Sequence, residues 1–401
     1  MRLLHVVPTY LPAWRHGGPI RAVHGLARAL AERGHEVTVF TTDVHGGGRL
    51  DVPLGRPVPL DSVEVWYFPT APPQRLYRSP ALGAALARRA GAVDLLHLHS
   101  VFLWPTRVAA RAAARAGVPY VLSPRGMLVP DLIRRRGRLR KLAWIHLVER
   151  PTLAGAAALH VTSALEGDEA RRLGLPLPPL AVVPNGVEPH GEGDLAEDAG
   201  EPPAAVRDLL AGPPFVLFLG RVSWKKGLDR LVAALPHAPG AVLAIAGNDE
   251  EGYRPALARL AAAQGVAERV IFTGPVHGAS KRALLAAARA LALPSASENF
   301  GNAVLEAMAA GCPVIVTPQV GLAEVVRETG SGIVADGSPE ALGGALRRLL
   351  EDAAAARAMG RRGAAAAARR FAWPAVAAAM EGVYAEALGG GARRRAAGAG
   401  A

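Results

Sequence analysis

Two glutamates, Glu298 and Glu306, bracket the start of an expected helix in the second half of the chain. An apolar strand at 290–293 precedes them, a loop of small residues follows it, and the helix is expected to begin near Gly301. The first N–H groups of a helix have no partner inside the helix, and the helix dipole lies behind them, so they attract anions. Carboxylates accept hydrogen bonds from hydroxyl groups. The arrangement therefore fits a ligand that carries both phosphates and a polyol, such as a nucleotide sugar.

Cations lie on a second loop, where Gly220-Arg221-Val-Ser-Trp-Lys225-Lys226-Gly227 follows an apolar strand. Transfer of a sugar from a nucleotide builds negative charge on the departing diphosphate, and two fixed cations stabilise that charge. No Asp-x-Asp sequence occurs in the chain. The usual carboxylate pair for a Mg²⁺-held nucleotide sugar is therefore missing, and we expect a site that uses no metal and no other cofactor.

The stretch from Glu298 to Glu306 has Phe-Gly-Asn between the glutamates and Ala-Ala-Gly-Cys-Pro-Val-Ile after them. It resembles the Glu-x7-Glu signature of the retaining glycosyltransferases of family 4, which have the GT-B fold. Two glutamates at this spacing occur by chance in many chains, whereas the full run is specific.

The resemblance implies a role for each matching residue. Arg221 and Lys226 would contact the donor diphosphate, whereas Lys225 would be a solvated neighbour. The carboxylate of Glu298 would bind hydroxyls of the donor sugar, and that of Glu306 would hold the ribose. The remaining implied donor contacts are the backbone N–H groups of Phe300, Gly301 and Asn302, and the side chain of Val304.

Glycines and histidines mark the first half. Gly17 and Gly18 follow the first expected strand and precede a helix, where glycine permits close approach to a phosphate. They match the family's glycine loop, which implies contact with the diphosphate and acceptor. The Gly-x-Gly-x-x-Gly fingerprint is absent there, which argues against a nicotinamide or flavin enzyme. His97 and His99 share one face of a strand; the resemblance implies that His99 contacts the donor sugar near the reacting carbon and that His97 is structural.

Two further loops of the first half have counterparts in the family. Ser123-Pro-Arg125-Gly-Met-Leu128 is similar to a loop that faces the acceptor in some of these enzymes, and Asn185-Gly-Val-Glu188 resembles a turn that closes the first domain. A metal site at His97 and His99 would need more ligands, and none stands nearby in the sequence.

Composition indicates a globular protein of two domains. The 401 residues are 50% hydrophobic but only 5% aromatic, and Cys312 is the single cysteine, which fits a reducing cytosol. The N-terminus reads as a strand without the features of a signal peptide, and no run approaches the roughly 20 apolar residues of a membrane-spanning helix. We expect a cytoplasmic protein that is at most peripheral on a membrane.

The net charge of +12 favours anionic partners, and Arg134–Lys141 concentrates it. Nucleic acid is not expected, because no stacking aromatic residues or nucleic-acid motif accompany the basic run. The run precedes Trp144, Ile145 and Leu147, and this combination suits a helix at an anionic membrane surface. The alternative is an ordinary solvated arginine-rich face.

Strands and helices alternate throughout, which predicts an α/β fold with parallel sheets. The expected GT-B architecture has two Rossmann-like domains facing across a cleft, where ligands bind at the carboxyl ends of the strands, and a last helix that crosses back to the first domain. The expected parts are an acceptor domain at 1–188, a linker at 189–204, a nucleotide-sugar domain at 205–370, a crossover helix at 371–388 and a disordered tail at 389–401.

Expected strands coincide with apolar runs. They lie at 3–7, 37–41, 63–68, 95–98, 120–122, 159–161 and 181–183 in the first half, and at 215–219, 241–246, 270–273, 290–293, 314–317 and 332–334 in the second.

Together with these observations, the resemblance implies a retaining glycosyltransferase that moves a sugar from a nucleotide-sugar donor to a glycan or polyprenyl-diphosphate-linked acceptor in surface polysaccharide synthesis. A nucleotide-sugar epimerase of the same fold and an inactive sugar-nucleotide-binding scaffold are the alternatives. A phosphorylase that uses pyridoxal phosphate would need a cofactor lysine that no motif identifies. The donor sugar, its base and the acceptor stay open.

Overall fold

The computed structural model describes residues 1–13, 18–130, 143–188 and 201–398. The chain forms two compact units: unit 1 comprises Met1–Gly186 and Trp373–Ala401, whereas unit 2 comprises Val187–Ala372. The last helix therefore belongs to the first unit, as the GT-B expectation requires. Gly17, the basic run Arg134–Lys141 and most of the expected linker lie outside the described residues.

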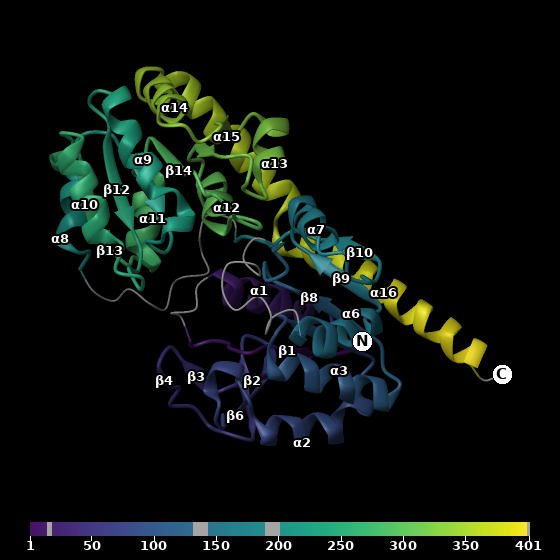
Figure 1. The fold of residues 1–401 in the computed structure, drawn as a ribbon. Helices are drawn as coiled ribbons and strands as arrows, with labels where there is room; N and C mark the ends of the chain where they lie inside the picture. Colours follow the sequence, from purple (N-terminus) through teal and green to yellow (C-terminus); the bar gives the residue numbers. More distant parts are fainter. Residues whose placement is uncertain (14–17, 131–142, 189–200, 399–401) are drawn as a thin grey trace. The chain divides into compact units, whose positions relative to one another are not determined.

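Unit 1 contains an eight-stranded sheet in the order β10-β9-β8-β7-β1-β2-β6-β5. Figure 1 labels several of its strands, among them β1, β2, β8 and β9. All neighbouring strands are parallel except β5, which runs antiparallel to β6. The strands are β1 (Arg2–Val6), β2 (Glu36–Thr42), β5 (Pro57–Leu60), β6 (Val63–Phe68), β7 (Leu95–His99), β8 (Tyr120–Ser123), β9 (Ala158–Val161) and β10 (Leu180–Val182), and a separate hairpin joins β3 (Val44–His45) to β4 (Gly48–Arg49). Each expected strand lies within one residue of its predicted ends.

Strand β5 was not expected, and its sequence explains why. Pro57 and Pro59 cannot donate backbone hydrogen bonds, so the segment lacks the usual appearance of a strand. It lies at the edge of the sheet, where only one side of the strand needs partners. The sheet is therefore mixed at this edge, a correction to the all-parallel prediction.

Helices cover both faces of this sheet. Apolar side chains alternate along the strands, so that Leu95 packs with α1 and α16 whereas its neighbour Leu96 packs with α2 and α3. The helices of unit 1 are α1 (Gly18–Glu32), α2 (Pro80–Arg89), α3 (Trp104–Ala116), α6 (Arg150–Gly155), α7 (Ala164–Arg171) and α16 (Trp373–Gly398), with shorter helical turns at Gln74–Leu76, Ala90–Ala92 and Ile145–Glu149.

Helix α16 is fixed to unit 1 at its beginning. The Trp373 side chain is buried where Gly25 of α1 and Gly186 approach, and a Cβ atom on either glycine would overlap the indole ring. Further along, the Arg33 guanidinium donates two hydrogen bonds of 2.7 Å to the Glu381 carboxylate. The helix continues to Gly398, past the expected end near Leu388, and replaces much of the predicted disordered tail with helix; the alanines and arginines of this stretch are strong helix formers.

Unit 2 contains a six-stranded parallel sheet in the order β13-β12-β11-β14-β15-β16. Its strands are β11 (Phe215–Leu219), β12 (Val242–Ala246), β13 (Val270–Gly274), β14 (Ala290–Leu293), β15 (Val314–Val316) and β16 (Gly332–Val334). Its helices are α8 (Ala204–Ala211), α9 (Leu228–Ala234), α10 (Arg254–Ala263), α11 (Gly278–Ala287), α12 (Asn302–Ala309), α13 (Ala323–Thr329), α14 (Pro339–Glu351) and α15 (Ala353–Arg370), with short turns at Trp224–Lys226, Leu235–His237 and Ala267–Arg269.

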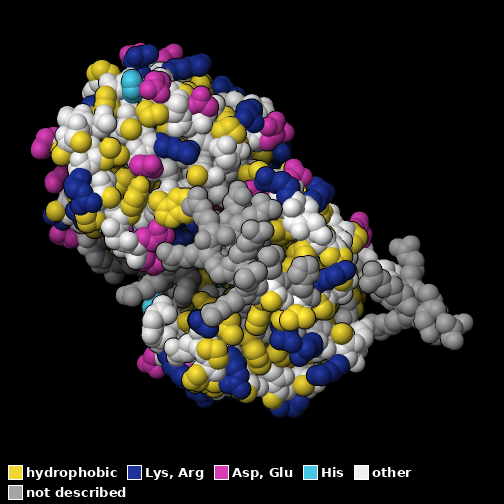
Figure 2. All heavy atoms as spheres, viewed as in Figure 1, with side chains coloured by type: hydrophobic (Ala, Val, Ile, Leu, Met, Phe, Trp, Pro, Cys, Tyr) yellow, Lys and Arg dark blue, Asp and Glu magenta, His cyan; other side chains and the backbone are white. Residues whose placement is uncertain are grey.

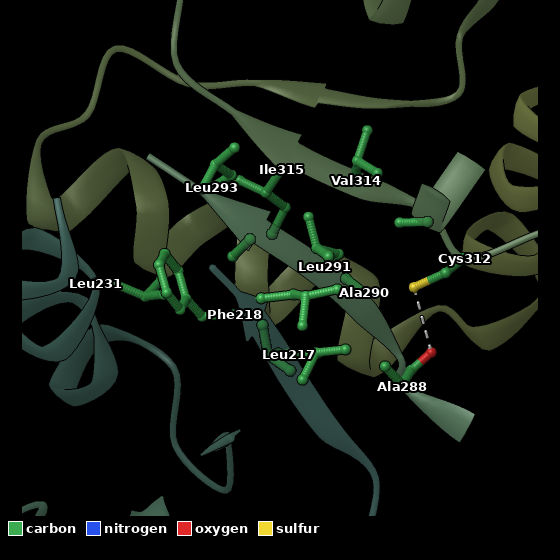
Figure 3. Close-up of a cluster of buried hydrophobic side chains, with 14 of the residues drawn as sticks. Leu217, Phe218, Leu231, Ala288, Ala290, Leu291, Leu293, Cys312, Val314 and Ile315 are labelled. Carbon is green, nitrogen blue, oxygen red and sulfur yellow. Dashed lines mark hydrogen bonds between the residues drawn. The ribbon is translucent and has the colours of Figure 1, made fainter. Parts of the chain in front are cut away.

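The central strands of unit 2 are apolar on both faces. Figure 3 shows side chains such as Leu217, Leu291 and Ile315 from β11, β14 and β15 gathered in one buried cluster. Cys312 belongs to it: its Sγ atom lies 3.7 Å from the carbonyl oxygen of Ala288, and burial raises the pKa of the thiol to about 12. Cys312 is therefore a protonated core residue.

The apolar flank expected beside the basic run is mostly turned inward. Ile145 is buried, the Trp144 indole N–H donates to the Glu149 carboxylate at 3.0 Å, and only Leu147 projects, with 76% of its surface exposed. No helix among the described residues is long and apolar enough to cross a membrane. On the face in Figure 2, positive side chains are spread among acidic and apolar ones.

Candidate functional site

In unit 2, the loop after β11 holds Arg221 and Lys226. The Ser223 side chain accepts a hydrogen bond from the Lys225 N–H and caps a short helical turn that ends at Gly227. Gly227 has a φ of +68°, and a Cβ atom there would overlap the carbonyl oxygen of Pro294. Glycine is therefore required where this loop meets the end of β14. Arg221 is exposed, and Lys226 is largely buried.

The loop after β14 carries Glu298 in a fixed position. Its N–H donates to the Gln319 carbonyl at 3.0 Å, and its own carbonyl accepts from the Gly321 N–H at 2.8 Å. The Glu298 carboxylate forms an ion pair with the Lys226 ammonium, and both side chains are about one-fifth exposed. Two residues that the sequence placed on separate loops are thus in direct contact.

The start of α12 lies directly beyond this ion pair. Gly301 precedes the helix with a φ of +99°, a conformation that favours glycine. The Phe300 side chain and Val304 are buried in the core, and Val304 lies under the Gly301 turn. Val304 therefore supports the turn from beneath. Within the described chain, the N–H groups of Phe300 and Gly301 have no protein acceptor, so this turn presents free donors beside a Lys–Glu pair.

Glu306 has a partner that the sequence did not reveal. Lys281 of α11 lies with its Nζ atom 3.5 Å from the Glu306 carboxylate, and the lysine side chain is only 12% exposed. Nothing in the Ser-Lys281-Arg sequence signals this role, since the contact depends on how α11 and α12 pack. Unit 2 therefore contains two Lys–Glu pairs that involve both glutamates of the signature.

In unit 1, His99 lies at the carboxyl end of β7 and is 1% exposed. Its Nδ1 atom accepts hydrogen bonds from Nε and Nη2 of Arg125, at 3.3 and 3.2 Å. Because arginine only donates, Nδ1 is the acceptor and the ring proton is on Nε2, which lies 3.2 Å from Nδ1 of His5. By the same logic His5 carries its proton on Nε2, and that buried atom has no partner among the described residues.

A second hydrogen-bond chain crosses the same sheet. The His160 Nε2 atom lies 2.9 Å from the Val183 carbonyl, which only accepts, so His160 donates there. Ser123 then donates to Nδ1 of His160 and accepts from Nε2 of His97, each at 2.7 Å. The chain ends with the Tyr384 hydroxyl, which donates to Nδ1 of His97 at 2.7 Å. It connects α16 with β7, β8 and β9.

The histidines of both hydrogen-bond chains are neutral. Burial, followed by the nearby Arg125 charge, lowers the pKa of His5 and of His160 to about 3. Burial likewise holds the pKa values of His97 and His99 well below their usual value. The cluster therefore consists of uncharged rings next to one guanidinium.

The structure corrects one prediction about these histidines. We expected no further metal ligand near His97 and His99, but His5 of β1 lies with them, and one nitrogen from each lies within 4.8 Å of the others. Both nitrogens of His97 and of His99 have protein hydrogen-bond partners, which occupies the atoms that a metal would need. For the same reason His99 has no free nitrogen for a sugar, and the cluster's accessible group is the half-buried Arg125.

Other predicted positions are placed as follows. Gly18 is the first residue of α1, whereas Gly17 is outside the described residues. The Asn185 side-chain oxygen accepts from Nη1 of Arg125 at 2.9 Å. The turn that begins at Asn185 also contains the boundary between the two units, which falls between Gly186 and Val187.

The two α/β units, with the last helix returned to unit 1, define a GT-B fold. Solved structures with this fold cover nearly the whole chain: sucrose-phosphate synthase from Thermosynechococcus elongatus covers 97% of this chain and 100% of its own, with 23% identity and a TM-score of 0.75. The Anabaena protein HepE in complex with UDP and glucose covers 96% and 99%, with 20% identity and a TM-score of 0.73.

Family models match both units. Residues 17–186 match the glycosyl transferase 4-like domain, and residues 205–366 match the glycosyl transferases group 1. The D-inositol 3-phosphate glycosyltransferase of Xylanimonas cellulosilytica is 34% identical over 96% of each chain, and a glycogen synthase of Mycobacterium tuberculosis is 30% identical over 96% of this chain and 94% of its own. The chain therefore belongs to the glycosyltransferase family that these two domain models describe.

Proposed function

We propose that this glycosyltransferase takes a sugar from a nucleotide-sugar donor that binds to unit 2. The observation that carries the proposal is the Lys226–Glu298 ion pair at the start of α12. A lysine suits a phosphate, a carboxylate suits sugar hydroxyls, and the N–H groups of Phe300 and Gly301 supply donors beside both. One small region thus contains a partner for each part of a sugar diphosphate.

The ion pair also suggests how the donor is accepted. Without a ligand, Lys226 and Glu298 satisfy each other, which avoids burying an unpaired charge. A donor diphosphate would replace Glu298 as the partner of Lys226, and the sugar hydroxyls would replace Lys226 as partners of Glu298. Negative charge then grows on the diphosphate as the bond to the sugar breaks, and Lys226 with the exposed Arg221 stabilises it.

The second Lys–Glu pair, Lys281 and Glu306, would bind the nucleoside part of the donor. Glu306 would accept hydrogen bonds from the two ribose hydroxyls, and its contact with Lys281 orients its carboxylate. A carboxylate that is prepared for a diol disfavours ligands without it, because the buried acceptor would lose its partners.

The same site favours transfer with retention by attack on the face of the departing phosphate. The other route needs an enzyme carboxylate as nucleophile on the opposite face of the sugar. Glu298 was the candidate nucleophile, but Lys226 engages its carboxylate, which suits hydroxyl binding. The proposed cations do the work that a metal does elsewhere, so the proposal requires neither a metal nor another cofactor.

The acceptor is proposed from the wider resemblance. Relatives named above are a D-inositol 3-phosphate glycosyltransferase and a glycogen synthase, so hydroxyls of polyols and glycans are the natural class. We retain a glycan or polyprenyl-diphosphate-linked acceptor of surface polysaccharide synthesis, used at the inner face of the membrane. Arg134–Lys141 would provide the contact with anionic lipid.

Donor binding and hydrolysis test the proposal. Wild type, Glu298→Ala and the control Glu268→Ala, an exposed glutamate of unit 2, are each titrated with UDP- and GDP-sugars in the presence of EDTA. We expect one donor to bind and hydrolyse slowly, with the loss confined to Glu298→Ala. If folded wild type binds no nucleotide sugar, the proposed function is wrong. Binding without any turnover favours the inactive scaffold, and conversion of the donor to its epimer favours the epimerase.

A further inference from the structure

Arg125 is the unusual charge of unit 1. It follows β8 with a φ of +53°, a conformation that is uncommon for a residue with a side chain. Ser100 and Phe102, which follow the adjacent strand β7, also have positive φ values. Strained backbone of this kind persists where the surrounding structure enforces it and is frequent at ligand sites.

The Arg125 guanidinium has no carboxylate partner among the described residues. Its acceptors are His99 Nδ1 and Asn185 Oδ1, both on neutral groups. The carboxylate of Glu166 is near enough to raise the pKa of Arg125, but it accepts from the Gly126 N–H at 2.7 Å and from the N–H and hydroxyl of Thr162 at 2.7 and 2.8 Å.

Burial of Arg125 has a measurable consequence. It lowers the pKa of the guanidinium to about 10, so Arg125 is still a cation at neutral pH. The surrounding histidines are neutral, and no ion pair within the described part of the chain offsets the charge. A cation held in this way costs stability unless a ligand pairs with it.

Donors for such a ligand are already present. Three N–H groups of Arg125 have acceptors in His99 and Asn185, which leaves N–H groups on Nη1 and Nη2. The fork of a guanidinium matches the oxygens of a phosphate or carboxylate. The hydrogen bond between His99 and His5 holds the His99 ring, and His99 in turn holds the guanidinium in one orientation.

We propose that Arg125, positioned by His99 and Asn185, binds an anionic group of the acceptor, a phosphate or a carboxylate. The inference rests on the proposed transferase function and adds the acceptor's chemical class. It assigns His99 a positioning role, in place of the direct contact with the donor sugar that the resemblance implied. Among the charged groups of unit 1, Arg125 combines burial, a strained backbone and spare donors.

The test uses the full-length protein labelled with ¹⁵N-histidine and inorganic phosphate as the probe. Phosphate bound to Arg125 changes the hydrogen bonds that the guanidinium makes to His99, so we expect the ring nitrogen signals of His99 and His5 to shift. Arg125→Gln should weaken this phosphate binding about tenfold or more. The control Arg259→Gln, which removes an exposed cation of α10 that has no proposed role, should leave the titration unchanged.

Two further measurements separate the possible interpretations. Without phosphate, Arg125→Gln removes an uncompensated charge but also leaves Nδ1 of buried His99 without its donor, so the two effects oppose each other and the melting temperature should stay close to that of wild type; loss of cooperative unfolding would indicate a structural role and overturn the proposal. Arg125→Lys keeps the charge without the planar fork of donors, so it should fold like wild type and bind phosphate several-fold more weakly; unchanged binding would mean that the guanidinium geometry has no role.

Titration with UDP distinguishes an anion of the donor from an anion of the acceptor. If UDP shifts the His99 signals and Arg125→Gln weakens UDP binding, Arg125 binds the donor diphosphate and the acceptor assignment is wrong. Phosphate titrations that leave His99 unmoved, or that Arg125→Gln does not alter, also overturn it. The nucleotide-sugar titrations with Glu298→Ala report on unit 2 independently, so failure of this proposal and failure of the proposed function give different results.

Discussion

The two units manage charge in opposite ways. In unit 2, Lys226 and Lys281 each pair with a glutamate, so the candidate donor site is electrically balanced before any ligand arrives. In unit 1, Arg125 contacts neutral histidine and asparagine, and the histidine rings around it carry no charge. A balanced site exchanges partners when a ligand binds, whereas an unbalanced one gains its first counter-charge. The two units thus offer two ways to receive an anion: a cation that exchanges a carboxylate partner, and a cation that has only neutral partners.

The largest expected effect is that acid lowers the unfolding free energy of unit 1 more than that of unit 2. The lowered pKa values of His5 and His160 mean that folded unit 1 binds fewer protons than its unfolded form between about pH 6.5 and pH 3. Its stability is therefore full above pH 6.5 and falls as the pH decreases. Each of these two histidines should cost about 2 kcal/mol by pH 5. Among the described residues, the histidines with lowered pKa values all belong to unit 1, so unit 2 should change less.

Urea unfolding at pH 7.5 and pH 5 measures this difference. Trp224 is the only tryptophan between residues 187 and 372, so the fluorescence of a Trp224→Phe variant reports on the part of the chain assigned to unit 1. Circular dichroism follows both units. If the fluorescence midpoint is the same at both pH values, the histidines are not held neutral by burial and the comparison fails.

The next largest effect is expected in unit 2. Lys226→Met should remove stabilisation of the departing diphosphate and reduce kcat by about 10²–10³-fold. Lys225→Met provides the matched control one position away, where the ammonium is not paired with Glu298, and its effect should stay within about threefold. Initial rates with the donor that the nucleotide-sugar titrations select measure both. Equal losses in the two variants would show that the loop supplies general positive charge, without a specific role for Lys226.

The candidate site of unit 2 is easier to recognise in the sequence than that of unit 1. Arg221, Lys226, Glu298 and Glu306 occur in two short stretches next to recognisable strands, so a local pattern is sufficient to find them. Lys281 was missed because its contact with Glu306 depends on the packing of two helices. The expected strands were placed within one residue, since apolar runs mark buried parallel strands directly.

Unit 1 shows what a local pattern omits. His97 and His99 were noticed as a pair, but His5, His160 and Tyr384 are far away in the sequence and meet them only through strand register and the return of α16. The order of the strands along the chain does not by itself indicate that β1 pairs with β7. The role proposed for Arg125 likewise depends on the absence of a carboxylate partner among the residues that the structure describes, which the sequence alone does not reveal.

A smaller effect should come from the turn that positions Lys226. Gly227→Ala places a methyl group against the Pro294 carbonyl and also strains a φ of +68°, so we expect a loss of about 3 kcal/mol in unfolding free energy. Gly240→Ala is the matched control, because its φ of +79° is similar but nothing lies within 4 Å of the added atom. It should cost about 1 kcal/mol. Urea unfolding of both variants measures the difference, and equal costs would mean that the loop moves freely from β14.

The smallest effect tests whether the two hydrogen-bond chains of unit 1 act separately. Tyr384→Phe leaves Nδ1 of buried His97 without a donor, which should cost about 1–2 kcal/mol. Tyr67→Phe is the control, since its hydroxyl donates to the Leu11 carbonyl and contacts no histidine. In ¹⁵N-histidine spectra, Tyr384→Phe should shift the signals of His97 and His160, whereas those of His5 and His99 stay in place because Arg125 fixes their protons independently. If all four histidines shift together, Arg125 does not control His99, and the anion site must be considered part of one network anchored by α16.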